Sequence, residues 1–182
     1  MVEALPVVRC PLHILYSEEN TMSLVAETIG LAGEYAVASE FCRRGAYCQL
    51  TLGNRKRTDL LVDTEDQLFR ISVKAKTKKS WPRIKGIWRR DEMLVFVDYK
   101  DKEIKTPPDF YVLDVRAWKK VVTRIKKRKE DPRAKIDKEN TLFWPASKGK
   151  KDGWIGCEVL ESDVTEFKDA WPVFNSPTDI GK

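Results

Sequence analysis

The sequence predicts an α/β domain in which helices flank a mixed β-sheet. Three observations lead to this fold class: a helical pattern near the N-terminus, a series of strand-length apolar runs after it, and an amphipathic helix that follows them. With 182 residues the chain suits one domain with a single core and is too short for two comfortable domains. We therefore predict a single domain, 1–182, with an N-terminal arm (1–20), a core (about 23–130) and a C-terminal extension packed on that core (131–182).

The first helix is predicted over residues 23–44, SLVAETIGLAGEYAVASEFCRR. Its apolar residues Val37, Ala38 and Phe41 share one stripe, which we expect to face the sheet. Glu34 precedes them by three, four and seven positions and so falls on the same stripe. The pattern therefore places a carboxylate at or near the buried side of the helix, unless Glu34 sits at the edge of the stripe and reaches solvent.

The predicted strands are recognised by their apolar patterns. The first alternates apolar and polar positions, as a half-buried strand does, and the fourth is a continuous apolar run typical of a strand buried on both faces. The polar residues 64–67 predict a hairpin turn between the second and third strands. The predicted strands are 46–52, 59–63, 69–76, 93–99 and 110–115.

A second helix over residues 115–129 completes the predicted core, with an apolar side formed by Trp118, Val122 and Ile125. Asp114 is placed to cap the N-terminal end of this helix, because a carboxylate accepts hydrogen bonds from free backbone N–H groups. Gly45 is expected to cap the C-terminal end of the first helix through its backbone, because glycine adopts the left-handed conformation that ends a helix. Both helices therefore have a sequence signal at one end.

Composition and motifs exclude several classes of function. No apolar run approaches the ~18 residues of a membrane span, and residues 1–20 lack the pattern of a secretion signal, so we expect a soluble, intracellular (cytoplasmic) protein. The four cysteines form no CxxC pair, and the single histidine, His13, has no metal-ligand spacing to them. Zinc binding and Ser-His or Cys-His catalysis are therefore disfavoured. Neither of the Gly-rich phosphate-binding motifs occurs.

Positive charge is concentrated in two segments. The first basic segment, Lys74–Arg90, and the second basic segment, Arg116–Lys129, each hold eight bases and no acid. The rest of the chain has only 18 of the 34 basic residues against all 28 acidic ones. This pattern favours a surface that binds a polyanion, most simply nucleic acid. The alternative is two solvated faces of a basic protein.

Two charged residues on neighbouring strands could do chemistry together. In the predicted third strand, FRISVKAK, alternation places Ser72 and Lys74 side by side on one face. Asp59 begins the predicted second strand, directly after a basic turn. With Glu34 on the covering helix, these residues make a workable site for Mg²⁺, which prefers oxygen ligands and few protein carboxylates. The alternative for Asp59 and Lys74 is an exposed cross-strand ion pair.

The segment GLAGEYAVASEFCRRGAYCQLTLGNRKRTDLLV, followed by FRISVKAKTKKSW, resembles the PD-(D/E)XK nuclease superfamily. It looks most like the small members with a core similar to Holliday-junction resolvases. The likeness covers roughly Thr28 to Val115 and implies a restriction-endonuclease-like core. It also implies that Glu34 is the helix carboxylate, Asp59 the main metal ligand and Lys74 the motif lysine.

The sequence departs from the family pattern at one position, where Ser72 stands in place of Glu or Gln. A neutral hydroxyl is a weaker ligand for Mg²⁺ than a carboxylate. The resemblance then implies a catalytic set of Asp59, Lys74, Glu34 and Ser72. It implies Mg²⁺ or Mn²⁺ held by Asp59, Glu34 and the carbonyl of Val73.

The function that the resemblance implies is a metal-dependent endonuclease, a phosphodiester hydrolase with DNA as the expected nucleic-acid partner. A catalytically inactive nucleic-acid-binding module on the same fold is the alternative, and a protein adaptor with acidic partners is a third. Many such nucleases act as twofold dimers, so a homodimer is among the expected partners. The expected nucleic-acid-binding residues are Arg55, Lys56, Arg57, Lys76, Lys78, Lys79, Arg83, Lys85, Arg89 and Arg90.

Overall fold

The computed structural model describes residues 18–51, 57–64, 66–146 and 153–173. The predicted N-terminal arm lies outside this part of the chain except for residues 18–20, which begin the first helix. The elements run in the order α1 (Glu18–Arg43), β1 (Tyr47–Leu50), β2 (Leu60–Asp63), β3 (Leu68–Lys76), β4 (Ser80–Ile84), β5 (Glu92–Asp98), β6 (Asp109–Asp114), α2 (Val115–Lys129), β7 (Lys135–Ile136), β8 (Leu142–Trp144), β9 (Trp154–Ile155), β10 (Cys157–Leu160), α3 (Glu161–Val164) and a 3₁₀ turn (Thr165–Phe167).

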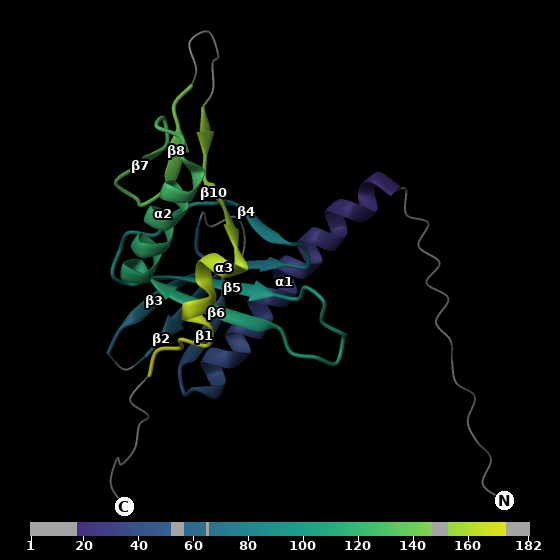
Figure 1. The fold of residues 1–182 in the computed structure, drawn as a ribbon. Helices are drawn as coiled ribbons and strands as arrows, with labels where there is room; N and C mark the ends of the chain where they lie inside the picture. Colours follow the sequence, from purple (N-terminus) through teal and green to yellow (C-terminus); the bar gives the residue numbers. More distant parts are fainter. Residues whose placement is uncertain (1–17, 52–56, 65, 147–152, 174–182) are drawn as a thin grey trace, which may run out of the picture.

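The centre of the fold is a five-stranded sheet in the order β1-β2-β3-β5-β6. The β3–β5 pair is parallel and the other three pairs are antiparallel, so the sheet is mixed. The helices α1 and α2 belong to separate hydrophobic clusters on its two faces (Figure 1). The predicted fold class, a mixed central sheet flanked by helices, is confirmed.

The α1 face of the sheet buries the stripe that the sequence predicts. Val37 and Phe41 are fully buried against Ile71 and Val73 of β3 and their neighbours on β2 and β5. Where α1 crosses β3, Gly33 comes so close that an added Cβ would lie 2.7 Å from Cβ of Ala75. Only a residue without a side chain permits this approach, and it brings the next residue, Glu34, close to the strand.

The α2 face is built around tryptophan and leucine side chains. Trp118 and Ile125 of α2 are fully buried, and they pack with Phe96 of β5 and Leu113 of β6. Asp114 accepts a hydrogen bond from the N–H of Ala117 at 2.7 Å, which confirms the predicted N-terminal cap. No helix in the described part of the chain combines the length and the apolar character needed to cross a bilayer.

Short strands, β4 before α2 and the others after it, form two smaller sheets that the sequence does not predict. One pairs β4 with β10, and the other is the three-stranded sheet β7-β8-β9, which projects beyond α2 (Figure 1). The strands after α2 have two to four residues and carry too little periodicity to be recognised, and β4 has Pro82 within its five residues. Further along the chain, Trp171 packs edge-on against Phe41 of α1 and Phe110 of β6, each with ring centroids 5.3 Å apart.

Candidate active site

The candidate site lies where β2 and β3 separate. Their last paired residues are Leu60 and Ile71, yet β3 continues to Lys76. Beyond this point the edge of β3 has no ladder partner on β2, and its backbone groups need other partners. The side chain of Asp59 supplies one, because its Oδ2 accepts a hydrogen bond from the N–H of Val73 at 2.6 Å.

Two side chains of β3 also donate hydrogen bonds to Oδ2 of Asp59. Nζ of Lys74 lies 3.2 Å from Asp59 Oδ2 and also donates to the carbonyl of Val73 at 2.7 Å. The hydroxyl of Ser72 donates to Asp59 Oδ2 at 3.3 Å. Among the described residues, the other oxygen, Oδ1, receives no hydrogen bond. The side chains of Asp59 and Lys74 remain 23% and 38% exposed, so the pair is open to a ligand.

The backbone of Asp59 is held from both sides. Its N–H donates to the carbonyl of Ile71 at 2.8 Å, and its carbonyl accepts from the N–H of Thr51 at 3.0 Å. The hydroxyl of Thr51 also donates to the carbonyl of Thr58 at 2.7 Å. Because β3 and the residue after β1 both fix this segment, the carboxylate is presented in a defined position.

Glu34 of α1, the residue after Gly33, interacts electrostatically with this pair. Burial is the main reason that its pKa is raised above the usual value, the negative charge of Asp59 raises it further, and the ammonium of Lys74 opposes the shift. Within the described part of the chain Glu34 has no hydrogen bond and no ion pair, and the structure therefore holds a half-buried carboxylate close to a second one. Such an arrangement favours a bound cation or a proton.

The structure thus brings Glu34, Asp59, Ser72, Lys74 and the Val73 carbonyl together. Ser72 is 7% exposed, and its hydroxyl supports Asp59. Asp59 and Lys74 do form the cross-strand ion pair that the simpler interpretation expects, but the pair also bonds the backbone of Val73. The catalytic role of these residues stays a prediction.

The donor set of the site consists of oxygen atoms. The described residues contain no cluster of three or more His, Cys, Asp or Glu side chains suited to a metal. What remains is the unbonded oxygen of Asp59, the unpartnered carboxylate of Glu34 and the carbonyl of Val73, which Lys74 already contacts. Two carboxylates with water in the other positions fit Mg²⁺, which keeps several waters in most protein sites.

Most of the expected nucleic-acid-binding residues that the structure describes are exposed. Arg55 and Lys56 fall outside the described residues. The exposed ones are Arg57, Lys78, Lys79, Arg83, Lys85, Arg89 and Arg90. In the second basic segment, Arg124, Arg128 and Lys129 instead form ion pairs with acids from residues 158–166.

Lys76 corrects the expected set. The charge pattern places it on the basic surface, but it is only 5% exposed and forms a buried ion pair with Asp98 on β5. Its ammonium lies 4.3 Å from the ring centroid of Trp81, which covers it. Lys76 is therefore an internal residue that cannot contact a phosphate backbone.

An arginine–tryptophan cluster beside the site was not predicted as a unit. The guanidinium of Arg57 lies 5.1 Å and that of Arg89 5.4 Å from the centroid of Trp88. Arg57 also forms an ion pair with Glu139 at 2.5 Å. In the sequence, Trp88 within an acid-free basic segment is the one feature that indicates this cluster. The pairing of Arg57 with Glu139, 82 positions away, cannot be predicted from the sequence.

No family model matches the chain, and no curated protein matches it. Among solved structures, the chain is similar to the bacterial homing endonuclease I-Ssp6803I, with a TM-score of 0.36 and 22% sequence identity. The similar region covers 49% of this chain and 68% of the homing endonuclease chain. A likeness of this size does not assign a function, which has to come from the side chains of the site.

Proposed function

We propose that the protein is a metal-dependent nuclease that hydrolyses phosphodiester bonds in DNA. One observation carries the proposal: Asp59 and Lys74 form a partly exposed pair at the fork between β2 and β3, and the half-buried carboxylate of Glu34 on α1 interacts electrostatically with both. A fold gains nothing in stability from an unpartnered, half-buried carboxylate beside a second one, so the arrangement points to a ligand.

In this proposal Asp59 and Glu34 hold Mg²⁺ or Mn²⁺, completed by the Val73 carbonyl and water. When bound, the metal supplies Lewis-acid polarisation of the phosphate and a lower pKa of a bound water. Ser72 keeps Asp59 oriented through its hydrogen bond to Oδ2, which leaves Oδ1 for the metal. The pocket of oxygen donors is thus prepared by β3 before any ligand arrives.

Lys74 acts on the phosphate itself. Its ammonium, 3.2 Å from Asp59, would donate to a non-bridging oxygen as negative charge develops in the transition state. Water adds across one P–O bond, so one product carries a phosphate monoester and the other a hydroxyl. The exposed bases of the first basic segment, among them Lys78, Lys85 and Arg89, bind the flanking phosphates.

A second candidate function is favoured by Ser72. The family that the chain resembles has a carboxylate or amide at this position, and a hydroxyl gives the site one strong ligand fewer. The protein would then be a nucleic-acid-binding module that keeps the fork and the basic residues but does not cleave.

A cleavage assay with Mg²⁺ or Mn²⁺ separates the two functions. Wild type and Ser72→Glu are incubated with supercoiled, linear duplex and single-stranded DNA, each with EDTA as the matched blank. The nuclease proposal expects metal-dependent cleavage by wild type, and an altered metal preference in Ser72→Glu. If neither form cleaves any substrate while both bind DNA, the binding module is the correct function.

A further inference from the structure

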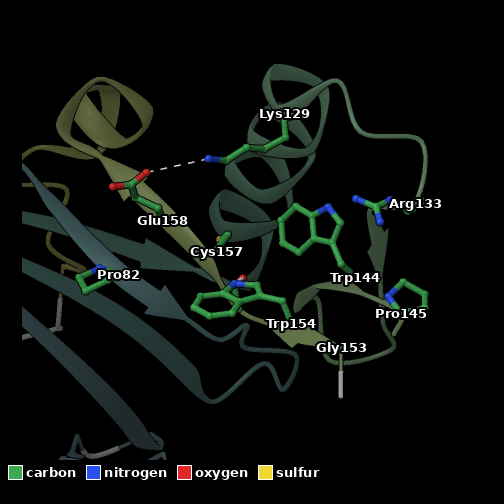
Figure 2. Close-up of a pocket in the computed structure, with 10 residues that line it drawn as sticks. Pro82, Lys129, Arg133, Trp144, Pro145, Gly153, Trp154, Cys157 and Glu158 are labelled. Atoms are coloured by element: carbon green, nitrogen blue, oxygen red, sulfur yellow. Dashed lines mark hydrogen bonds and ion pairs between the residues drawn. The ribbon is translucent and has the colours of Figure 1, made fainter. Parts of the chain in front are cut away.

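A second feature of the molecule, separate from the fork, is a hollow of about 610 Å³ formed by the β8–β9 hairpin, the end of α2 and β10. Trp144 and Trp154 are directly opposed in the register of β8 and β9, so both indoles lie on one side of the hairpin. Figure 2 shows Lys129 extending from α2 toward Glu158 of β10, and Arg133 beside Trp144.

The indole of Trp154 is held in place by its N–H group, because Nε1 donates to the carbonyl of Gly156 at 3.0 Å. Trp144 is half-buried and packs against the hydrophobic cluster on the α2 face. Trp154 nevertheless keeps 50% of its surface exposed, which is high for a side chain of this size. A ring that is fixed at one edge and still half exposed, as Trp154 is, is prepared to stack on a flat partner.

Cations surround these rings. The guanidinium of Arg83 lies 5.3 Å from the ring centroid of Trp154, and it is turned there by a left-handed backbone with φ of 56° at the irregularity between β4 and β10. The side chain of Lys129 is 38% exposed, and its ammonium lies 3.9 Å from the carboxylate of Glu158, which also lines the hollow. The ligand that matches open aromatic faces with cations at the rim is a base attached to phosphates.

We propose that the hollow between Trp144 and Trp154 binds unpaired bases of single-stranded nucleic acid by stacking, with Lys129 and Arg83 contacting the adjacent phosphates. The site goes beyond the proposed cleavage function, because it needs neither a metal nor Asp59. The short sheet connects the two regions: the β7–β8 turn carries Glu139, the partner of Arg57 beside the fork, and β8 leads from there to Trp144. Five residues of extended chain span at most ~18 Å. One strand of nucleic acid could therefore contact both regions.

Binding of a fluorescein-labelled oligothymidylate of about a dozen nucleotides, followed by anisotropy in EDTA, tests the proposal. Because cleavage is blocked, the result does not depend on the nuclease function. Trp154→Ala should weaken binding at least fivefold, since stacking of one base on an aromatic side chain changes affinity by about five- to a hundredfold. Trp154→Phe, which keeps an aromatic face, should stay within about twofold of wild type.

Two controls make the effect specific. Tyr47→Ala removes an aromatic side chain of similar exposure, 67%, from β1 on the central sheet and should leave the affinity unchanged. With an abasic oligonucleotide of the same length, wild type should bind at least fivefold more weakly, and Trp154→Ala should weaken binding no further. The wild-type part of this second comparison does not depend on how the variant folds.

Three results would overturn the proposal. The first is that wild type binds the abasic and the normal oligonucleotide equally well. The second is that Trp154→Ala binds the normal oligonucleotide with unchanged affinity. The third is that Trp154→Ala weakens binding of a blunt duplex without unpaired bases as much as it weakens binding of the oligonucleotide. Binding of a proline-rich peptide that Trp154→Ala abolishes, without any binding of the oligonucleotide, would show that the hollow is a peptide site instead.

Discussion

Lys76 and Asp98 face each other in register across the parallel strands β3 and β5 and form an ion pair in which both side chains are at most 5% exposed. Lys74, two residues earlier on the same face of β3, is 38% exposed beside Asp59. The two lysines differ in what covers them: Trp81 lies over Lys76, whereas the fork leaves Lys74 open. One strand thus carries a structural and a candidate functional lysine.

The buried pair predicts a large stability effect. Asp98→Ala leaves the ammonium of Lys76 without its counter-charge and should lower the free energy of unfolding by about 3–5 kcal/mol. The double variant Asp98→Ala with Lys76→Met should be destabilised much less, because the uncompensated charge is gone. Urea denaturation of wild type, the two single variants and the double variant measures the free energy of unfolding of each. Strictly additive effects would contradict a direct interaction.

Glu34 should reduce the stability of the protein at neutral pH. Its folded-state pKa is raised by burial and by Asp59, so its ionised form costs stability as the pH rises from about 4.5 through that raised pKa. Glu34→Gln should therefore melt about 1–3 °C higher than wild type near neutral pH, and the difference should vanish near pH 4. Adding Mg²⁺ should raise the melting temperature of wild type more than that of Glu34→Gln. Thermal unfolding scans provide both comparisons, and a lower melting temperature for Glu34→Gln would contradict the account.

The close approach of α1 to β3 can be tested with a matched pair of glycine variants. Gly33→Ala places a Cβ 2.7 Å from Ala75 and should destabilise the protein by about 1–3 kcal/mol, because the helix must move away. This movement also carries Glu34 away from Asp59, so cleavage should fall more than stability alone explains. Gly30→Ala, on the same helix with nothing within 4 Å, should be neutral or stabilising by up to about 1 kcal/mol. Equal effects of the two variants would show that the approach is unimportant.

The first basic segment should carry most of the salt dependence of DNA binding. Replacing the exposed residues Lys78, Lys85, Arg89 and Arg90 with Gln should flatten the slope of log K against log salt by about 0.9 for each phosphate that the variant no longer neutralises. The matched control removes the same charge from the second basic segment, at Lys119, Lys120, Lys126 and Lys127. Fluorescence anisotropy over a salt series compares the two. A larger change in the control would assign DNA binding to α2.

The parts of the fold that the sequence predicts are those fixed locally. The helix α2 begins after the capping Asp114, and alternation along β3 correctly puts Ser72 and Lys74 on one face, where Asp59 reaches them. The burial of Lys76 could not be predicted, because Trp81 is held over it by β4, which pairs with β10 more than seventy positions later.

The hollow between Trp144 and Trp154 could not be predicted from the sequence for a related reason. Its strands, β8 and β9, are two or three residues long, and their pairing depends on close backbone contact at Gly153, where an added Cβ would lie 2.2 Å from the carbonyl of Trp144. Such contacts between distant short segments carry no periodic signal. The sequence pattern therefore indicates only packing for these tryptophans.

The central claim is that Asp59 at the fork is the residue on which DNA cleavage depends. Single-turnover cleavage with saturating protein and Mg²⁺ tests it most directly, because DNA affinity then no longer limits the rate. Asp59→Ala should reduce the rate constant to the level of the EDTA blank, whereas Asp63→Ala, an exposed carboxylate at the other end of β2, should retain the wild-type rate. Cleavage by Asp59→Ala at the wild-type rate would contradict the account.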